Sequence, residues 1–208
     1  MTLTNKEVAC GACGHKSHQY FLDKQYNFDL FDYNDSLNIN ENIKFLLQQC
    51  PNCGYIETDI SKPVNDKVLD FKKIYKPFDE LYDSDLAARF AKYACYLSKI
   101  GGYKGACDSF LYSAYIYDGL KKKDRTHMML RFALDFANEL AFSVNKCDRK
   151  KYMVLRADIL RRVGEFEKVF EIDINDIALD KQDRSILLYE KELAKNKDQN
   201  IFLINSFK

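Results

Sequence analysis

The sequence has 208 residues, of which 47% are hydrophobic and 30% are charged, and its formal net charge at pH 7 is +1. This balance is that of a globular protein, and a net charge so close to zero does not favour a general polyanion binder. The first residues hold no apolar stretch with a cleavage site, and no apolar run approaches ~18 residues, which argues against a signal peptide and a membrane-spanning helix. We therefore expect a cytoplasmic protein with no membrane contact.

Residues 1–62 carry two copies of a Cys-x-x-Cys-Gly motif. The first runs from Cys10 to Gly14 and the second from Cys50 to Gly54. In each motif the chain turns tightly between two thiols, and the glycine suits the backbone conformation after the second thiol. In a reducing compartment such pairs are better explained as metal ligands than as disulfides. The motifs predict a zinc-ribbon module over residues 1–62.

The predicted metal ligands are Cys10, Cys13, Cys50 and Cys53. Four thiolates suit one tetrahedral zinc ion, and iron is the main rival metal for the same ligand set. Four protein ligands leave no position for a water molecule, so we expect one structural zinc ion per chain rather than a catalytic site. His15 and His18 follow the first motif, and we expect them to lie outside the ligand set.

The spacer between the two motifs is longer than in the simplest ribbons. It comprises residues 14 to 49, which is 36 residues, against roughly 15–20 in the simplest pattern. We therefore expect an insertion between Tyr20 and Gln49, with a helical turn near residues 43–48.

Residues 63–78 form a predicted connector between the ribbon and the rest of the chain. Prolines stand near both of its ends, and its spacing predicts a short helix over residues 64–74. From Phe78 onward the sequence contains no proline. Because proline is the usual helix breaker, its absence predicts an all-helical domain over residues 79–208.

Apolar residues in this domain recur at helical spacing. Ser84 or Asp85 is placed to cap the first helix, and Gly101 to end it. The breaks between the helices are short, which predicts antiparallel neighbours. The predicted helical stretches are 86–97, 106–117, 130–144, 152–163, 166–170 and 185–193.

Two turns of the helical domain have similar sequences. Residues 100–106 align with residues 163–169, and both read apolar, glycine, any residue, aromatic, two residues, small apolar. This pattern is typical of the turn within tetratricopeptide-type hairpins, where the aromatic residue packs back on the preceding helix. An irregular helical bundle with two similar turns is the alternative.

The combination resembles a bacterial family in which a zinc ribbon leads into tetratricopeptide-like helices. The resemblance is carried by Cys50–Tyr55, by the acidic and apolar stretch Glu57–Ile60, and by Arg161–Phe166. The first motif departs from it, with Gly11 where proline is common. The resemblance implies an α+β architecture, a small N-terminal zinc ribbon followed by an all-α tetratricopeptide-like antiparallel helical domain, and it implies no activity.

No catalytic motif accompanies the metal site. Cys95, Cys107 and Cys147 fall on or near predicted helices, where a cysteine usually packs as a small apolar residue. Three basic clusters, at residues 121–123, 149–151 and 161–162, fall at predicted helix ends or junctions, where cations complement the helix dipole. We therefore expect a non-enzymatic protein.

Two functions remain open. The first is a scaffold or adaptor whose helical surface binds a protein or peptide partner. The apolar tail at residues 201–204 is expected to bury itself either on the last pair of helices or between two copies of the chain. The alternative is nucleic-acid binding through the ribbon. The lysines in or beside the ribbon are Lys16, Lys24, Lys62, Lys72, Lys73 and Lys76.

Overall fold

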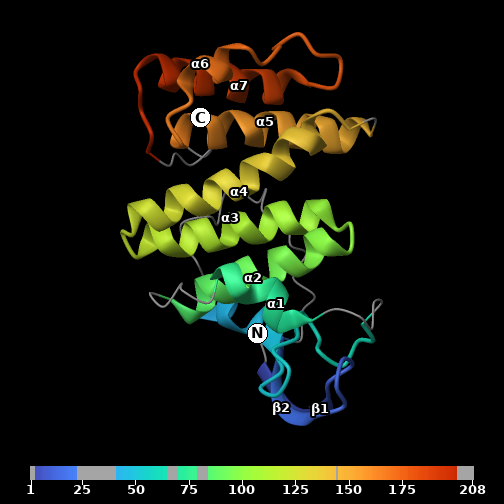
Figure 1. Ribbon diagram of the computed structural model, residues 1–208. Helices are drawn as coiled ribbons and strands as arrows, with labels where there is room; N and C mark the ends of the chain where they lie inside the picture. The colour runs from blue at the N-terminus through green and yellow to red at the C-terminus, as the bar shows by residue number, and fades with distance from the viewer. Residues whose placement is uncertain (1–2, 23–40, 65–69, 79–83, 144, 201–208) are drawn as a thin grey trace.

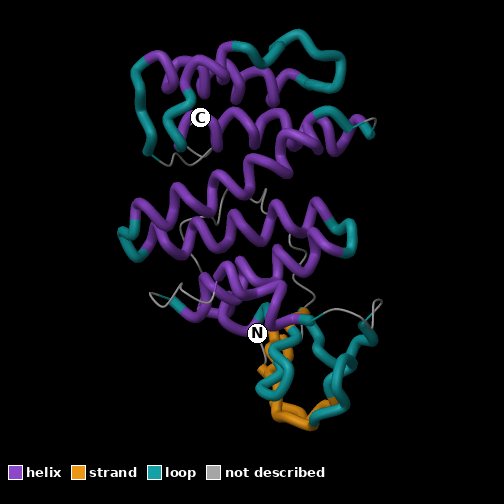
Figure 2. Tube along the Cα trace, in the orientation of Figure 1, coloured by secondary structure: helices purple, strands orange, loops and turns teal. Residues whose placement is uncertain are grey.

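The computed structural model describes residues 3–22, 41–64, 70–78, 84–143 and 145–200. Short strands occupy the N-terminal part, and helices dominate the described residues from Phe71 onward (Figure 1 and Figure 2). This confirms the α+β class. No helix in these ranges is long and apolar enough to cross a membrane. The apolar tail at residues 201–204 lies outside them.

The first two strands form an antiparallel hairpin. β1 (Leu3–Ala9) pairs with β2 (Lys16–Leu22), and the turn between them holds the first cysteine motif. Most of its side chains are exposed or half-buried. Because an isolated two-stranded hairpin is marginally stable in water, this one depends on the groups at its turn for stability.

A second, shorter hairpin carries the other motif. The 3₁₀ helix η1 (Glu41–Phe45) leads into β3 (Gln48–Gln49), which pairs with β4 (Ile56–Glu57). The predicted turn near residues 43–48 is thus a 3₁₀ helix that begins slightly earlier. Most of the predicted insertion, residues 23–40, lies outside the described residues.

Gln48 joins the two hairpins from a buried position. Its side-chain amide donates to the backbone oxygen of Tyr20 at 3.0 Å, and its amide oxygen accepts from the backbone N–H of Ile60 at 3.0 Å. A buried amide satisfied on both sides fixes the two hairpins relative to each other.

The helical domain contains every helix that the apolar spacing predicts. Ser84 caps the first of them by accepting from the backbone N–H of Ala87. Two short helices precede this domain, α1 (Phe71–Tyr75) and the 3₁₀ helix η2 (Lys76–Phe78). The helices of the domain are α2 (Asp85–Lys99), α3 (Tyr103–Gly119), α4 (Lys123–Ala141), α5 (Lys146–Arg162), α6 (Phe166–Phe170) and α7 (Lys181–Lys195). The predicted connector helix begins only at Phe71, and residues 65–69 are not described.

The two similar turns have the same backbone geometry. Gly101 and Gly164 both adopt positive φ, at 79° and 82°. In each turn the residue after the glycine donates its backbone N–H to the carbonyl oxygen five positions earlier, at 2.8 Å. The likeness ends there, because α3 has 17 residues and α6 has five. Tyr103 also packs forward against Phe136 of α4, which differs from the predicted contact with the preceding helix.

Consecutive helices from α2 to α5 pack against each other, while α3 and α5 run in the same direction (Figure 1). Contacts between α3 and α5 follow the same order along both helices, which shows their parallel course. They are Lys104 with Asp148, Asp108 with Lys151, and Tyr115 with Arg162. α7 continues this layer, since Lys150 pairs with Asp180 and Arg161 with Glu190.

Two of the three basic clusters, residues 149–151 and 161–162, have partners within or beside this layer. Arg149, Lys150 and Lys151 occupy the first two turns of α5, where cations oppose the helix dipole, and each is paired with an aspartate of another segment. Arg161 is fully buried, and it bonds Glu190 at 2.6 Å, Asp158, and two backbone oxygens that follow α7. The expectation that these cations complement a helix dipole is therefore wrong for residues 149–151, whereas Arg161 does lie in the last turn of α5, as expected.

The ribbon and the helices share one core. Tyr55 lies between Phe71 of α1 and Tyr96 of α2, with ring centroids 5.0 and 5.7 Å away. The hydroxyl of Tyr93 donates to Glu57 at 2.9 Å. The residues of the predicted connector therefore include core positions, and α1 packs between the ribbon and α2.

Candidate metal centre

The two cysteine motifs adopt matching turns. The backbone N–H of Cys10 donates to the oxygen of His15, and that of Cys50 donates to Tyr55. In each turn the glycine after the second cysteine donates to the first cysteine and has positive φ, 72° at Gly14 and 80° at Gly54. Both turns therefore present two sulfurs on one side, as the motifs predict.

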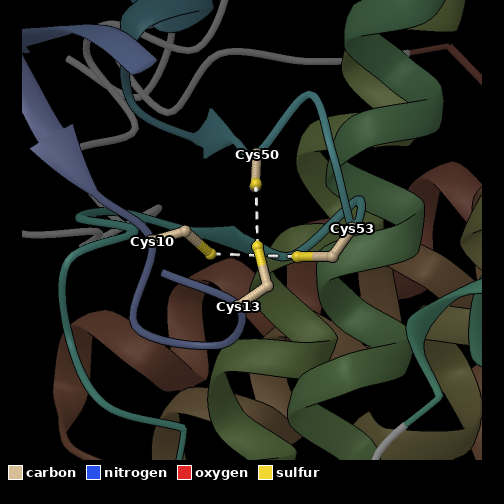
Figure 3. A group of neighbouring side chains, drawn as sticks. All are labelled: Cys10, Cys13, Cys50 and Cys53. Carbon is tan, nitrogen blue, oxygen red and sulfur yellow. Dashed lines mark hydrogen bonds between the residues drawn. The ribbon is translucent and has the colours of Figure 1, made fainter. Parts of the chain in front are cut away.

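The four predicted ligands come together in space (Figure 3). The Sγ atoms of Cys10 and Cys53 are 3.8 Å apart, those of Cys13 and Cys50 are 3.7 Å apart, and all four lie within 4.8 Å of one another. A tetrahedral zinc site with Zn–S bonds of about 2.3 Å has S···S edges of about 3.8 Å. The separations of 3.7 and 3.8 Å fit that geometry. They also exclude disulfides between these pairs, because the sulfurs of a disulfide stand about 2.05 Å apart.

The surroundings of the four thiols differ. Cys10 and Cys50 are buried, Cys53 is half-buried and Cys13 is exposed. Burial raises the pKa of Cys10 and Cys53 above the usual value of a thiol. The side-chain amide of Asn52 and the backbone N–H of His15 lower the pKa of Cys13 to about 6. Cys13 is thus the sulfur whose negative charge is best stabilised by neighbouring donors.

The two nearby histidines stand apart from the cysteine cluster. His15 is exposed and contributes its backbone to the first turn. The ring of His18 is exposed and lies 3.3 Å from the side-chain oxygen of Asn5. Among the described residues, the cluster able to hold a metal ion contains the four cysteines alone.

The structure explains why position 11 is glycine rather than the proline that is common in the family this sequence resembles. Its backbone N–H donates to the oxygen of Ile60 at 2.7 Å, a bond that proline cannot make. A Cβ atom at this position would lie 1.9 Å from the backbone oxygen of Lys62. The chain that leaves the ribbon therefore passes directly against the first turn.

The remaining cysteines lie away from the metal centre. Cys107 is buried and donates to the backbone oxygen of Ala133, and Cys95 is half-buried in α2. Both fit the predicted packing role. Cys147 is exposed in the first turn of α5, so the packing interpretation is wrong for it.

The lysines beside the ribbon that the structure describes do not share one set of contacts. Lys62 bonds Thr58 and pairs with Glu57, and Lys73 pairs with Asp70 at the start of α1. Lys16, Lys72 and Lys76 are exposed. Lys24 lies outside the described residues.

The sequence motifs identified all four candidate ligands but not the supporting residues Asn52, Gln48 and Arg89. Arg89 of α2 donates to the backbone oxygens of Lys44 and Leu47, at 3.3 and 3.1 Å, and so holds the second hairpin against the helices. The position of Asn52 inside a cysteine motif was its one signal in the sequence. Comparison with known proteins finds no matching family model, and neither the curated proteins nor the solved structures give a significant match.

Proposed function

We propose that this chain is a non-enzymatic cytoplasmic protein that binds one structural zinc ion and uses its helical domain as a scaffold for a protein partner. The observation that carries the first half is the four-sulfur cluster, whose S···S separations of 3.7 and 3.8 Å suit a tetrahedral ion. Four protein ligands fill the coordination sphere of zinc, which suits a structural role and leaves no position for a reacting water.

Metal analysis of the purified chain tests the zinc assignment. We expect one zinc ion per chain, lost in Cys50→Ser. An iron signal with the absorption of a four-thiolate iron centre would contradict zinc while keeping the site. No bound metal after purification and reconstitution with zinc would contradict the site itself.

The parallel layer of α3, α5 and α7 supports a tetratricopeptide-like scaffold. In helical-repeat proteins every second helix runs parallel and lines one face of the stack. The stack here also carries a row of contacting rings along α3 and α4, in which Tyr103 is 46% and Phe132 is 37% exposed. Partly exposed aromatic side chains are enriched where proteins bind each other.

A partner screen with matched surface variants tests the scaffold. We expect a partner bound by the full chain to be lost in Tyr103→Ser and in Phe132→Ser. Phe142 is 73% exposed at the end of α4 and has no place in the row of rings, so Phe142→Ser serves as the control. Binding that survives both ring variants, or that needs Phe142 equally, would contradict this surface.

A second candidate function is binding of single-stranded nucleic acid through the ribbon. It is favoured by cations that lie over aromatic rings on the outer strands and on η1, with Lys6 5.7 Å from the ring of Phe21 and Lys44 5.0 Å from that of Phe45. Basic and aromatic side chains together suit a strand of nucleotides. Retardation of labelled oligonucleotides at low salt, weakening steeply as salt rises, would support it, and no shift at low salt would exclude it.

A further inference from the structure

The metal centre has two equivalent corners. The matching hydrogen bonds of the two turns make Cys10 correspond to Cys50, and Cys13 to Cys53. The sulfur separations follow the same correspondence. Each joins the first cysteine of one turn to the second cysteine of the other, Cys10 to Cys53 at 3.8 Å and Cys50 to Cys13 at 3.7 Å. Cys13 and Cys53 are therefore corresponding ligands, each the second cysteine of its turn.

The rest of the chain breaks this symmetry. Cys53 is half-buried and packs against the hydrophobic core that the ribbon shares with the helices. Cys13 is exposed, so the metal ion is most open to water and to competing ligands at this corner.

Asn52 stands at the open corner. It belongs to the second turn, and its side-chain N–H reaches across to the Sγ atom of Cys13 at 3.6 Å. The corresponding position of the first turn is Ala12, which has no side-chain donor. A side-chain donor is thus present beside the exposed sulfur of Cys13. The equivalent position for the half-buried sulfur of Cys53 is Ala12, which offers no donor.

We propose that Asn52 is a positioning residue of the metal centre, which holds the Cys13 thiolate in place and slows loss of the metal through this corner. The inference rests on the proposed zinc site. A hydrogen bond to a thiolate stabilises its charge and restricts its motion, and loss of such an outer contact typically lowers metal affinity about 10–100-fold.

The test compares zinc-loaded wild type with Asn52→Ala and with Asn52→Asp, which keeps the shape of the side chain but replaces its donor by a negative charge. Asn5→Ala is the control, because Asn5 is an exposed amide of the same module that contacts His18 and no sulfur. Zinc transfer to a chromophoric chelator gives the rate of metal loss. Alkylation by N-ethylmaleimide, followed by peptide mass spectrometry, gives the order in which the cysteines react.

We expect both Asn52 variants to lose zinc at least tenfold faster than wild type, with Asn52→Asp the faster. Among the four candidate ligands, Cys13 should be labelled first. In cobalt-substituted protein the thiolate-to-metal charge-transfer band should move to lower energy in Asn52→Ala, because the sulfur has lost a donor. Asn5→Ala should match wild type in every readout.

Rates within twofold of wild type would overturn the role of Asn52 alone. Faster loss with the four candidate ligands labelled equally and an unchanged cobalt spectrum would do the same. Wild-type protein that holds neither zinc nor cobalt would overturn the proposed metal site as well. Because Asn52 is exposed, we expect the variants to fold, and far-ultraviolet circular dichroism verifies this.

Discussion

At the scale of single residues, the fold of the ribbon depends on a close backbone approach at Gly11. The Cβ atom of any other residue would meet the backbone oxygen of Lys62 at 1.9 Å, and a backbone atom cannot swing aside as a side chain does. We predict that Gly11→Ala destabilises the zinc-loaded module by about 2–3 kcal/mol. Thermal unfolding of the loaded protein measures this.

The control for Gly11 is Gly119→Ala. A Cβ atom on Gly119, at the end of α3, would have no neighbour within 4 Å. This variant should unfold like wild type or slightly later. Equal effects of the two substitutions would show that the close approach at Gly11 carries no energetic weight.

Lys121 is held in a conformation that suits glycine. It lies just after α3 with φ of 58°. The next residue, Lys122, donates its backbone N–H to the carbonyl oxygen of Tyr117 five positions earlier, as happens in the turn at Gly101. Positive φ destabilises the folded state by roughly 1–2 kcal/mol at a residue with a side chain, and glycine removes this cost. Glycine also gives the unfolded chain more conformational entropy, which offsets part of the gain in stability. We predict that Lys121→Gly raises the free energy of unfolding by about 0.5–1 kcal/mol in urea titrations.

The same substitution two positions later should act in the opposite direction. Lys123 begins α4 with ordinary helical geometry, so Lys123→Gly should lower the free energy of unfolding by up to about 1 kcal/mol. If both variants shift stability in the same direction, loss of positive charge rather than backbone conformation is the cause.

Glu190 gives the helical domain a pH dependence of predictable sign. Burial raises the pKa of this carboxyl to about 7, against the opposing effect of Arg161. A carboxyl whose folded-state pKa lies above its unfolded value stabilises the fold fully below about pH 4, and this stability is lost as pH rises through 7. We predict that the stability of wild type relative to Glu190→Gln falls between pH 4.5 and pH 7, by up to about 3 kcal/mol.

Urea titrations of both proteins at a series of pH values measure this difference. The glutamine variant removes the titration and keeps the size of the side chain, so a constant offset between the two proteins does not affect the slope. A difference that grows with rising pH would mean that Arg161 dominates and lowers the pKa of Glu190.

At the scale of elements, the sequence predicted the features that depend on local periodicity and local chemistry. The apolar stripes placed α2 to α7, and the two motifs placed the four ligands, because both signals lie within a few neighbouring residues. The capping role of Ser84 and the turns at Gly101 and Gly164 were likewise local, and the structure confirms them.

Contacts between distant segments could not be predicted from the sequence. The full burial of Arg161 follows from Glu190 and from backbone oxygens after α7, which no nearby residue signals. The paired cations at the start of α5 depend in the same way on aspartates of α3 and of the segment before α7. The tetratricopeptide-like repeat stays a prediction, because the short α6 does not reproduce the hairpin that α3 completes.

At the scale of the whole molecule, the shared core couples the module that holds the cysteine cluster to the first helices. Tyr55 packs on Phe71 and Tyr96, so unfolding of the ribbon uncovers one side of α1 and α2. We predict that chelation of the metal, or Cys13→Ser, unfolds the ribbon and leaves α3 to α7 folded. The driving force is large, since structural zinc contributes on the order of 10–16 kcal/mol to folding of small modules.

Hydrogen exchange read by mass spectrometry locates that change. Protection should be lost in both hairpins, reduced in α1 and on the adjoining part of α2, and kept in α4 and α5. Loss of protection along the whole chain would mean that ribbon and helices unfold as one unit, and unchanged protection in the hairpins would mean that they need no metal.

The central claim, that four cysteines hold one structural zinc ion, is tested most directly by the mass of the intact protein under native conditions, recorded with and without a chelator. We predict a mass excess of one zinc ion per chain, lost with the chelator and absent from Cys50→Ser and Cys53→Ser. A wild-type mass equal to that of the bare chain after reconstitution with zinc would contradict the claim.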